Sequence, residues 1–253
     1  GVSTSVAVTD NAFSGTADLS AVTDNTALAV SADVSDAAGN AATQFTKNIV
    51  LDTAAPTIDT LVVSTDDTVN SSDTKSAVAF SGITTGVEDN QNITVVIGGV
   101  STSVAVTDNA FSGTADLSAV TDNTALAVSA DVSDAAGNAA TQFTKNIVLD
   151  TAAPTIDTLV VSTDDIINSS DTKSAVAFSG TTTGVEDNQN ITVVIGGVST
   201  SVAVIGNAFS GTADLSAVTD STALAVTANV SDQAGNAASQ FSKTIVLDTT
   251  EPV

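Results

Sequence analysis

The segment TALAVSADVSDAAGNAATQFTKNIVLD, residues 124–150, contains two runs with strand character and a turn between them. In the first run apolar residues occupy every second position, at Leu126, Val128, Ala130 and Val132. A period of two is typical of a β-strand with one buried face. The Gly-Asn pair at 137–138 marks a turn, and the following run to Leu149 is again rich in β-branched residues. This stretch predicts two β-strands joined by a turn.

The same pattern recurs along the chain with a period of 98 residues. Residues 1–98 and 99–196 differ at three positions only, Thr68/Ile166, Val69/Ile167 and Ile83/Thr181. The third copy begins at Gly197 and is truncated and more divergent. A period of this length is too long for a solenoid unit and matches one small domain per repeat. The sequence therefore predicts an array of domains.

The boundaries of these domains are indicated by the prolines, one in each copy, at Pro56, Pro154 and Pro252. Proline cannot donate to a central β-ladder and stiffens its neighbourhood, so we interpret these segments as linkers. The predicted organisation is an incomplete C-terminal half-domain, two complete domains and the start of a further linker, at 1–53, 54–151, 152–249 and 250–253. We expect the chain to be a segment of a longer array.

Within residues 54–151 strand and turn signals alternate at short, regular spacing. The predicted strands are Thr57–Ser64, Ser76–Gly82, Asn92–Ile97, Ser101–Thr107, Ala110–Leu117, Thr124–Val132 and Thr141–Leu149. Seven short strands in about a hundred residues favour an all-β fold, a two-sheet sandwich of immunoglobulin type repeated end to end. Phe80, Phe111 and Phe143 are predicted to lie in the core. Lys145 falls on the apolar face of its strand, which requires either a bulge or a lysine that extends to the surface.

The composition excludes most enzyme chemistry. Histidine, cysteine, methionine, tryptophan and tyrosine are absent, so Ser-His-Asp and Cys-His nucleophiles, His/Cys zinc sites and redox cysteines cannot be built. The 29 acidic residues face only 5 lysines, and the net charge of −24 argues against a nucleic-acid partner. No apolar run approaches the roughly 20 residues of a membrane helix, so we expect no direct membrane insertion. We expect any export signal to lie outside this segment.

A specific motif, Ser-Asp-x-Ala-Gly-Asn, occurs once in each copy, at 35–40, 133–138 and 231–236. In every copy the chain then continues into Ile-Val-Leu-Asp-Thr and the proline linker. This pattern resembles the bacterial Ig-like repeats of giant cell-surface adhesins, the type I-secreted, RTX-type proteins of biofilm and surface attachment. The resemblance implies extracellular display, a long tandem array that acts as an extender, and calcium bound near the domain junctions. It implies no particular adhesive target.

The positions of the acidic residues lead to calcium independently. If seven strands alternate up and down, the linker, the second-to-third strand loop and the Ser-Asp-x-Ala-Gly-Asn loop lie at one end of each domain. Converging carboxylates repel one another unless a cation lies between them, and calcium accepts six to eight oxygen ligands in flexible geometry, whereas magnesium demands a stricter octahedron. The predicted metal ligands are Asp52, Glu88, Asp89 and Asp134 at one junction and Asp150, Glu186, Asp187 and Asp232 at the next.

Alternatives remain at the level of sequence. Asp108 and Asp122 can be ordinary turn residues, and the acidic loop 65–73 can be a solvated face or a second cation site. We interpret the chain as a structural extender whose partners are calcium ions and neighbouring repeats, with any surface or cell target contacted through other regions. The alternative is an Ig-like module that itself binds a receptor, a glycan or a neighbouring cell. An enzyme is the least favoured class.

Overall fold

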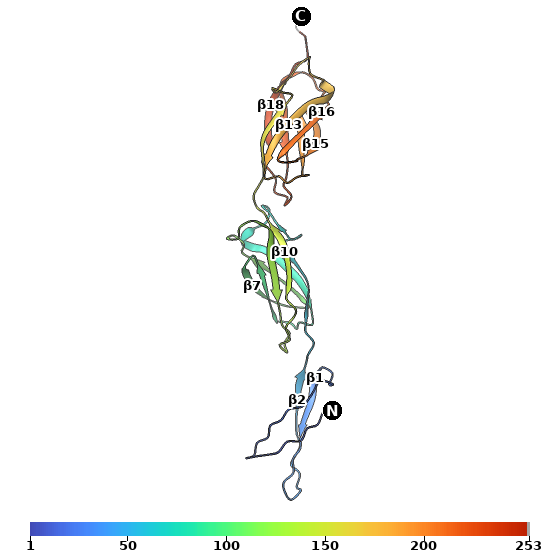
Figure 1. Ribbon diagram of the computed structural model, residues 1–253, viewed down its shortest axis with the longest axis vertical. Coiled ribbons are helices and arrows are strands. Elements are labelled where there is room, and N and C mark those ends of the chain that lie inside the picture. The colour runs from blue at the N-terminus through green and yellow to red at the C-terminus, as the bar shows by residue number, and fades with distance from the viewer. Residues whose placement is uncertain (252–253) are drawn as a thin grey trace.

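The computed structural model describes residues 1–251, and these residues form an all-β chain. Two β-sandwiches follow one another along a single long axis, with a smaller N-terminal β-unit below them (Figure 1). Thr250 and Glu251 of the expected terminal linker are described, whereas its Pro252 lies outside the described residues. No helix among residues 1–251 is long and apolar enough to cross a membrane.

The first sandwich consists of a three-stranded sheet packed against a five-stranded sheet. The strand orders are β3-β5-β8 and β4-β10-β9-β6-β7, and every pairing is antiparallel except that of β4 with β10. The strands are β3 (Thr57–Val63), β4 (Thr68–Val69), β5 (Val78–Thr85), β6 (Asn92–Ile97), β7 (Val100–Ala105), β8 (Ala110–Ala115), β9 (Asn123–Asp131) and β10 (Phe143–Leu149). This arrangement of sheets is the immunoglobulin-like sandwich that the strand count predicted.

The second sandwich repeats the first, element by element. Its sheets have the orders β11-β13-β16 and β12-β18-β17-β14-β15. The strands are β11 (Thr155–Val161), β12 (Ile166–Ile167), β13 (Val176–Thr183), β14 (Asn190–Ile195), β15 (Val198–Ala203), β16 (Ala208–Ala213), β17 (Ser221–Asn229) and β18 (Phe241–Leu247). The prediction of tandem sandwiches arranged end to end is confirmed.

Each sandwich has its own hydrophobic core between its two sheets. The alternating residues of β9 and the adjoining Val132 are buried, as their period predicted. Phe80 and Phe111 are also buried, and Phe143 is half-buried and packs against the edge of the core. Removing this apolar surface from water is the main stabilising contribution to each unit.

Two short elements were not predicted. They are β4, which lies between the first two expected strands, and a 3-10 turn at Lys75–Ala77, which includes the first two residues of the second expected strand. Two residues are too few to produce an alternating pattern, yet Val69 is fully buried and pairs in parallel with Leu149. The second strand consequently begins at Val78 and not at Ser76.

Lys145 is accommodated by its own length. Its Nζ donates to the backbone oxygen of Leu61 and to the carboxylate of Asp67, so the charged end is paired across the two sheets. The irregularity in the pairing of β9 and β10 lies further along, between Ile147 and Leu149. Of the two options that the sequence left open at this position, the structure uses the extended lysine.

The N-terminal unit has only two strands, β1 (Asn25–Ala32) and β2 (Phe45–Leu51). They pair as β9 and β10 do, but no residue of 1–53 is buried. Phe13 is 63% exposed, whereas its counterpart Phe111 is 3% exposed. In the first sandwich residues 57–97 supply the strands that cover this face, and in the described part of the chain nothing covers it on residues 1–53.

Candidate cation sites at the junctions

At the first junction the three predicted acidic segments do meet. The side chain of Asn138 donates from Nδ2 to the backbone oxygen of Asp52 in the linker, at 3.1 Å. The backbone N–H of Ala135 donates to Oε2 of Glu88, at 2.8 Å. These two bonds hold the linker, the β5–β6 loop and the Ser-Asp-x-Ala-Gly-Asn loop together at one end of the first sandwich.

Asp134 is directed into its own loop. Its Oδ1 accepts from the backbone N–H of Asn138 and its Oδ2 accepts from Nδ2 of Asn138, each at 2.8 Å. Burial raises the pKa of the Asp134 carboxyl, but the hydrogen bonds from Asn138 outweigh it, so the pKa lies below its usual value. Gly137 completes the turn with a φ of +95°, a conformation that favours glycine. Both Asp134 oxygens therefore orient Asn138.

Asp52 and Glu88 line one cavity of about 440 Å³ between the linker and the β5–β6 loop. Oδ1 of Asp52 accepts from the backbone N–H of Ala54, at 3.1 Å. In the described part of the chain, Oδ2 of Asp52 and Oε1 of Glu88 have no hydrogen-bond donor. The remaining lining comes from Ala54, Ala55, Thr57, Thr85, Gly86 and Val87. This cavity brings two of the predicted ligands together with an oxygen of each still free.

Asp89 and its counterpart Asp187 bind a neighbouring turn. Oδ1 of Asp89 accepts from the backbone N–H of Asp108 at 2.8 Å, and Oδ1 of Asp187 accepts from Gly206 at 2.7 Å. Asp108 and Asn109 have φ values of 51° and 59°, so the turn interpretation of Asp108 is confirmed. Since the donor is a backbone N–H, the change from Asp108 to Gly206 between repeats preserves this bond.

The other acidic residues weighed from the sequence have different partners. Asp122 accepts from the backbone N–H of Thr151 at 2.8 Å and pairs with Lys75 at 3.1 Å, so it anchors the following linker. In the loop 65–73, Asp67 pairs with Lys145, and Asp73 accepts from Ser64 Oγ and from the backbone N–H of Asn70, at 2.8 and 2.9 Å. These carboxylates are bound by donors of their own sandwich.

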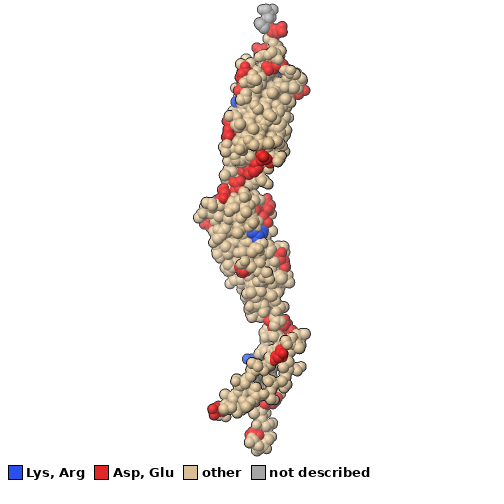
Figure 2. Space-filling view, viewed as in Figure 1, with Lys and Arg blue, Asp and Glu red and all other residues tan. Residues whose placement is uncertain are grey.

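The second junction repeats these contacts. Asn236 donates from Nδ2 to the backbone oxygen of Asp150 at 3.0 Å, and both oxygens of Asp232 bind Asn236 at 2.8 Å. The backbone N–H of Gln233 donates to Oε2 of Glu186 at 2.8 Å. Acidic side chains gather at the constriction between the two sandwiches (Figure 2).

Contacts from the preceding sandwich reach this second junction as well. Nδ2 of Asn70 donates to the backbone oxygen of Ala234 at 2.9 Å. The backbone N–H of Ser71 donates to Oδ1 of Asn236 at 2.6 Å. The sequence alone predicted no role for the asparagine of the Ser-Asp-x-Ala-Gly-Asn motif, and it marked Asn70 and Ser71 only as part of a glycosylation-acceptor triplet of the kind that is common by chance. The regular presence of an amide at the last motif position was the signal available.

The potential ligands at the first junction suit a hard cation, because they are carboxylate, carbonyl and hydroxyl oxygens. Among residues 1–251, however, no three acidic side chains converge on one position that could hold a metal ion. A cation in the Asp52–Glu88 cavity would therefore draw its further ligands from backbone carbonyls and water. Calcium accepts such ligands in flexible geometry, whereas magnesium requires a near-ideal octahedron.

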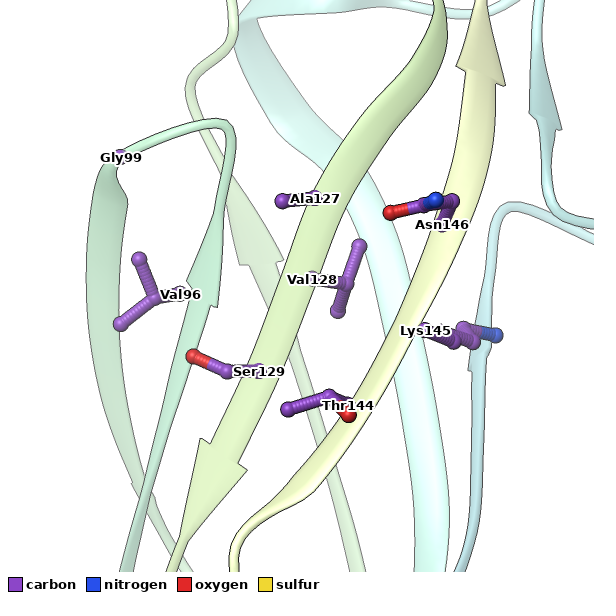
Figure 3. A pocket seen from close by; sticks show the side chains of 8 residues that line it. All are labelled: Val96, Gly99, Ala127, Val128, Ser129, Thr144, Lys145 and Asn146. Carbon is purple, nitrogen blue, oxygen red and sulfur yellow. The ribbon is translucent and has the colours of Figure 1, made fainter.

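A second cavity, of about 360 Å³, lies on the outer face of the five-stranded sheet (Figure 3). Small neutral side chains line it, and the only charged lining residue, Lys145, extends from β10 away from β9. The lining residues are Val96, Gly99, Ala127, Val128, Ser129, Thr144, Lys145 and Asn146. This set contains no acid that could pair with a nucleophile or bind a cation.

No family model and no curated protein matches the chain. Among solved structures it is similar to the Ca²⁺-stabilized adhesin with which an Antarctic bacterium reaches out and binds ice, with 30% identity, 93% of this chain and 59% of that chain covered, and a TM-score of 0.44. A 1.5-MDa bacterial ice-binding adhesin is 25% identical, with 88% and 74% covered and a TM-score of 0.45. A tetra-tandem repeat from the extending region of a large adhesion protein is 30% identical, with 92% and 60% covered and a TM-score of 0.37.

The first two of these proteins are described as bacterial adhesins and the third as tandem repeats of a large adhesion protein, which is the class that the sequence motif indicated. The chain spans 59% of the length of the Antarctic protein.

Proposed function

We propose that this chain is a structural extender region of a bacterial cell-surface adhesin, displayed outside the cell. In this proposal the Ig-like domains 54–151 and 152–249 stand end to end, and calcium stiffens their junctions. The observation that carries the proposal is the linker at Asp150, whose backbone oxygen is held by Asn236 of the following sandwich. A linker held in this way keeps consecutive sandwiches on one axis (Figure 1).

Calcium would be held by carboxylate oxygens of the linker and of the loop beside it. These are Asp52 and Glu88 at the first junction and Asp150 and Glu186 at the second, with Asp89 and Asp187 next to them in sequence. Asp134 and Asp232 would act through the loop that they hold in place. The ion would neutralise mutual repulsion between these acids, and extracellular modules bind it with dissociation constants of about 10⁻⁴–10⁻³ M. One similar protein is described as Ca²⁺-stabilized, which agrees with this assignment.

The experiment is small-angle scattering and calorimetry on the whole chain, with calcium and with chelator. We expect chelation to widen the range of orientations between the domains, and so to change the dimensions measured by scattering, and to lower the melting temperature. The double variant Glu88→Gln, Glu186→Gln should behave in calcium as the unmodified chain does in chelator. Asp116→Asn is the matched control, because Asp116 accepts only from Ser118 of its own turn, at 2.9 Å. If calcium changes neither the dimensions nor the melting temperature, its proposed role is wrong.

The rival function is direct adhesion by the Ig-like domains to a receptor, a glycan or a neighbouring cell. It predicts self-association that rises with protein concentration, or saturable binding to a glycan array. An extender function predicts a monomer that binds no glycan on the array. Sedimentation and glycan-array binding on the same sample therefore distinguish the two functions.

A further inference from the structure

The contact between the two sandwiches contains direct hydrogen bonds that involve no acidic side chain of the preceding sandwich. We name it the junction contact: Asn70 Nδ2 to Ala234 O at 2.9 Å, and Ser71 N–H to Asn236 Oδ1 at 2.6 Å. Asn70 and Ser71 follow β4 at the far end of the first sandwich, and Ala234 and Asn236 belong to the Ser-Asp-x-Ala-Gly-Asn loop of the second. The junction contact therefore joins the segment after β4 of one repeat to the Ser-Asp-x-Ala-Gly-Asn loop of the next.

Asn236 is the residue on which three segments converge. Its Nδ2 donates to Asp232 in its own loop and to the backbone oxygen of Asp150 in the linker, while its Oδ1 accepts from Ser71. Its polar side chain is 1% exposed, and every polar atom of its amide is bonded. A buried amide with all partners satisfied fixes the geometry of the groups around it, because any tilt leaves one of them unpaired.

Equivalent asparagines of the two sandwiches, one in contact with the other sandwich and one not, show what the contact between the sandwiches contributes. Asn138 makes the same bonds to Asp134 and to Asp52, yet it is only half-buried, since no group in residues 1–53 donates to its Oδ1 in the described structure. Conversely, Asn168 is the counterpart of Asn70 and is followed by the same residues, although Ile166 and Ile167 precede it in place of Thr68 and Val69. Asn168 is exposed, whereas Asn70 is half-buried. The extra burial at Asn70 and Asn236 comes from docking of one sandwich on the next.

We infer that the Asn70–Ser71 segment of each repeat is a docking surface for the Ser-Asp-x-Ala-Gly-Asn loop of the following repeat. This pair sets the relative orientation of the two sandwiches without a metal ion. The inference rests on the proposed extender function only for its biological purpose. It adds a specific partner for each loop and a source of stiffness that persists when calcium is removed.

The decisive variant is Ser71→Pro. Ser71 is the second residue of a turn closed by the Asp73 N–H and the Asn70 oxygen at 3.0 Å, a position where proline is favoured. Proline has no N–H, so the turn is retained while the donor to Asn236 is lost. Ser169→Pro is the matched control, because the same turn closes there with the same 3.0 Å bond but no following sandwich lies against it in the described residues.

A second pair of variants uses the asparagines. Asn236→Ala removes the side-chain bonds to Asp232, to the linker and to Ser71 at the second junction. Asn138→Ala removes the side-chain bonds to Asp134 and to the linker at the first junction. Asn138→Ala therefore tests whether a sandwich tolerates the loss of this amide, and Ser71→Pro, which leaves the linker bond of Asn236 in place, isolates the junction contact. Melting curves of all four variants show whether each sandwich remains folded.

The measurement is the distance distribution between nitroxide labels at Ser103→Cys and Ser201→Cys, which are exposed, equivalent positions on the two sandwiches. The chain has no native cysteine, so the labels are unique. In chelator we expect one narrow distribution for the unmodified chain and for Ser169→Pro and Asn138→Ala, and loss of that narrow peak for Ser71→Pro and Asn236→Ala. A broad distribution for the unmodified chain in chelator overturns the inference, and so does a Ser71→Pro distribution as narrow as that of Ser169→Pro.

Repeating the distance measurement with added calcium separates this inference from the proposed function. If added calcium narrows the distribution of Ser71→Pro, calcium stiffens the junction independently and both proposals stand. If calcium has no effect on any variant while the chelated unmodified chain is narrow, the junction contact stands and the calcium role fails.

Discussion

Phe111 and Phe13 occupy the same position in two identical stretches of sequence, and truncating each to alanine tests the fold directly. Phe111 is 3% exposed, and its ring lies over Gly82, where a Cβ would come within 2.3 Å of the Phe111 Cζ. With no side chain at Gly82 to fill the space, Phe111→Ala leaves a cavity, so we expect a loss of about 3–5 kcal/mol of stability. For a domain of this size that loss lowers the melting temperature by about 12–40 °C.

Phe13→Ala is the matched control. Phe13 is 63% exposed, and an exposed truncation changes stability by no more than about 0.5 kcal/mol. The chain has no tryptophan or tyrosine, so scanning calorimetry is a better assay than intrinsic fluorescence. We expect Phe111→Ala to give two separate melting transitions in calorimetry, because the sandwich 57–149 then melts at a lower temperature than the sandwich 155–247. Equal effects of the two substitutions would refute the assignment of the core to residues 57–149.

Three further outcomes are expected. Burial raises the pKa of Asp67, but bonds from Lys145 and from the backbone N–H of Val63 outweigh it, so the pKa lies below its usual value. The stability from this group is present above about pH 4, the unfolded value, and is lost as the pH falls through the lower native value. Asp67→Asn should therefore be less stable than the parent at pH 7, with a gap that closes towards pH 2 in calorimetry; a gap constant with pH would contradict this. Gly82→Ala should strongly destabilise the first sandwich in urea unfolding, since its Cβ would lie 2.1 Å from the backbone oxygen of Thr60; an unchanged midpoint would exclude the contact. Limited proteolysis followed by mass spectrometry should cleave residues 1–53 before either sandwich, because none of them is buried, and simultaneous cleavage would argue against the exposed state.

Much of the fold could be predicted from local pattern. The alternation in Leu126, Val128 and Ala130 predicted a strand with one buried face, and all three side chains are buried. Up-and-down strands also place alternate loops at one end, so the meeting of Glu88 with the Ser-Asp-x-Ala-Gly-Asn loop followed from strand count alone. The number and type of metal ligands did not follow, because side-chain direction depends on which N–H groups lie nearby.

The structure assigns those directions through hydrogen bonds, some within one loop and some between distant segments. Asp134 was predicted as a ligand, yet both of its oxygens bind Asn138, and Asp89 binds the backbone N–H of Asp108. The parallel pairing of Val69 with Leu149 is equally invisible to a periodicity argument, since two residues have no period. The folded geometry of the loops and strands, and not the hydrophobic period, decides these hydrogen bonds.

Residues 1–53 and 99–151 have the same sequence, so any structural difference between them comes from the tertiary structure around them. The sequence by itself determined strand positions, turns and the pairing register, because these depend on neighbours along the chain, and β1–β2 pairs as β9–β10 does. Burial was decided only by tertiary structure: Phe111 is covered by strands from residues 57–97, and Phe13 is not. The physical reason is that the hydrophobic effect acts on surface removed from water, and that surface exists only when a second segment of the fold lies against the first.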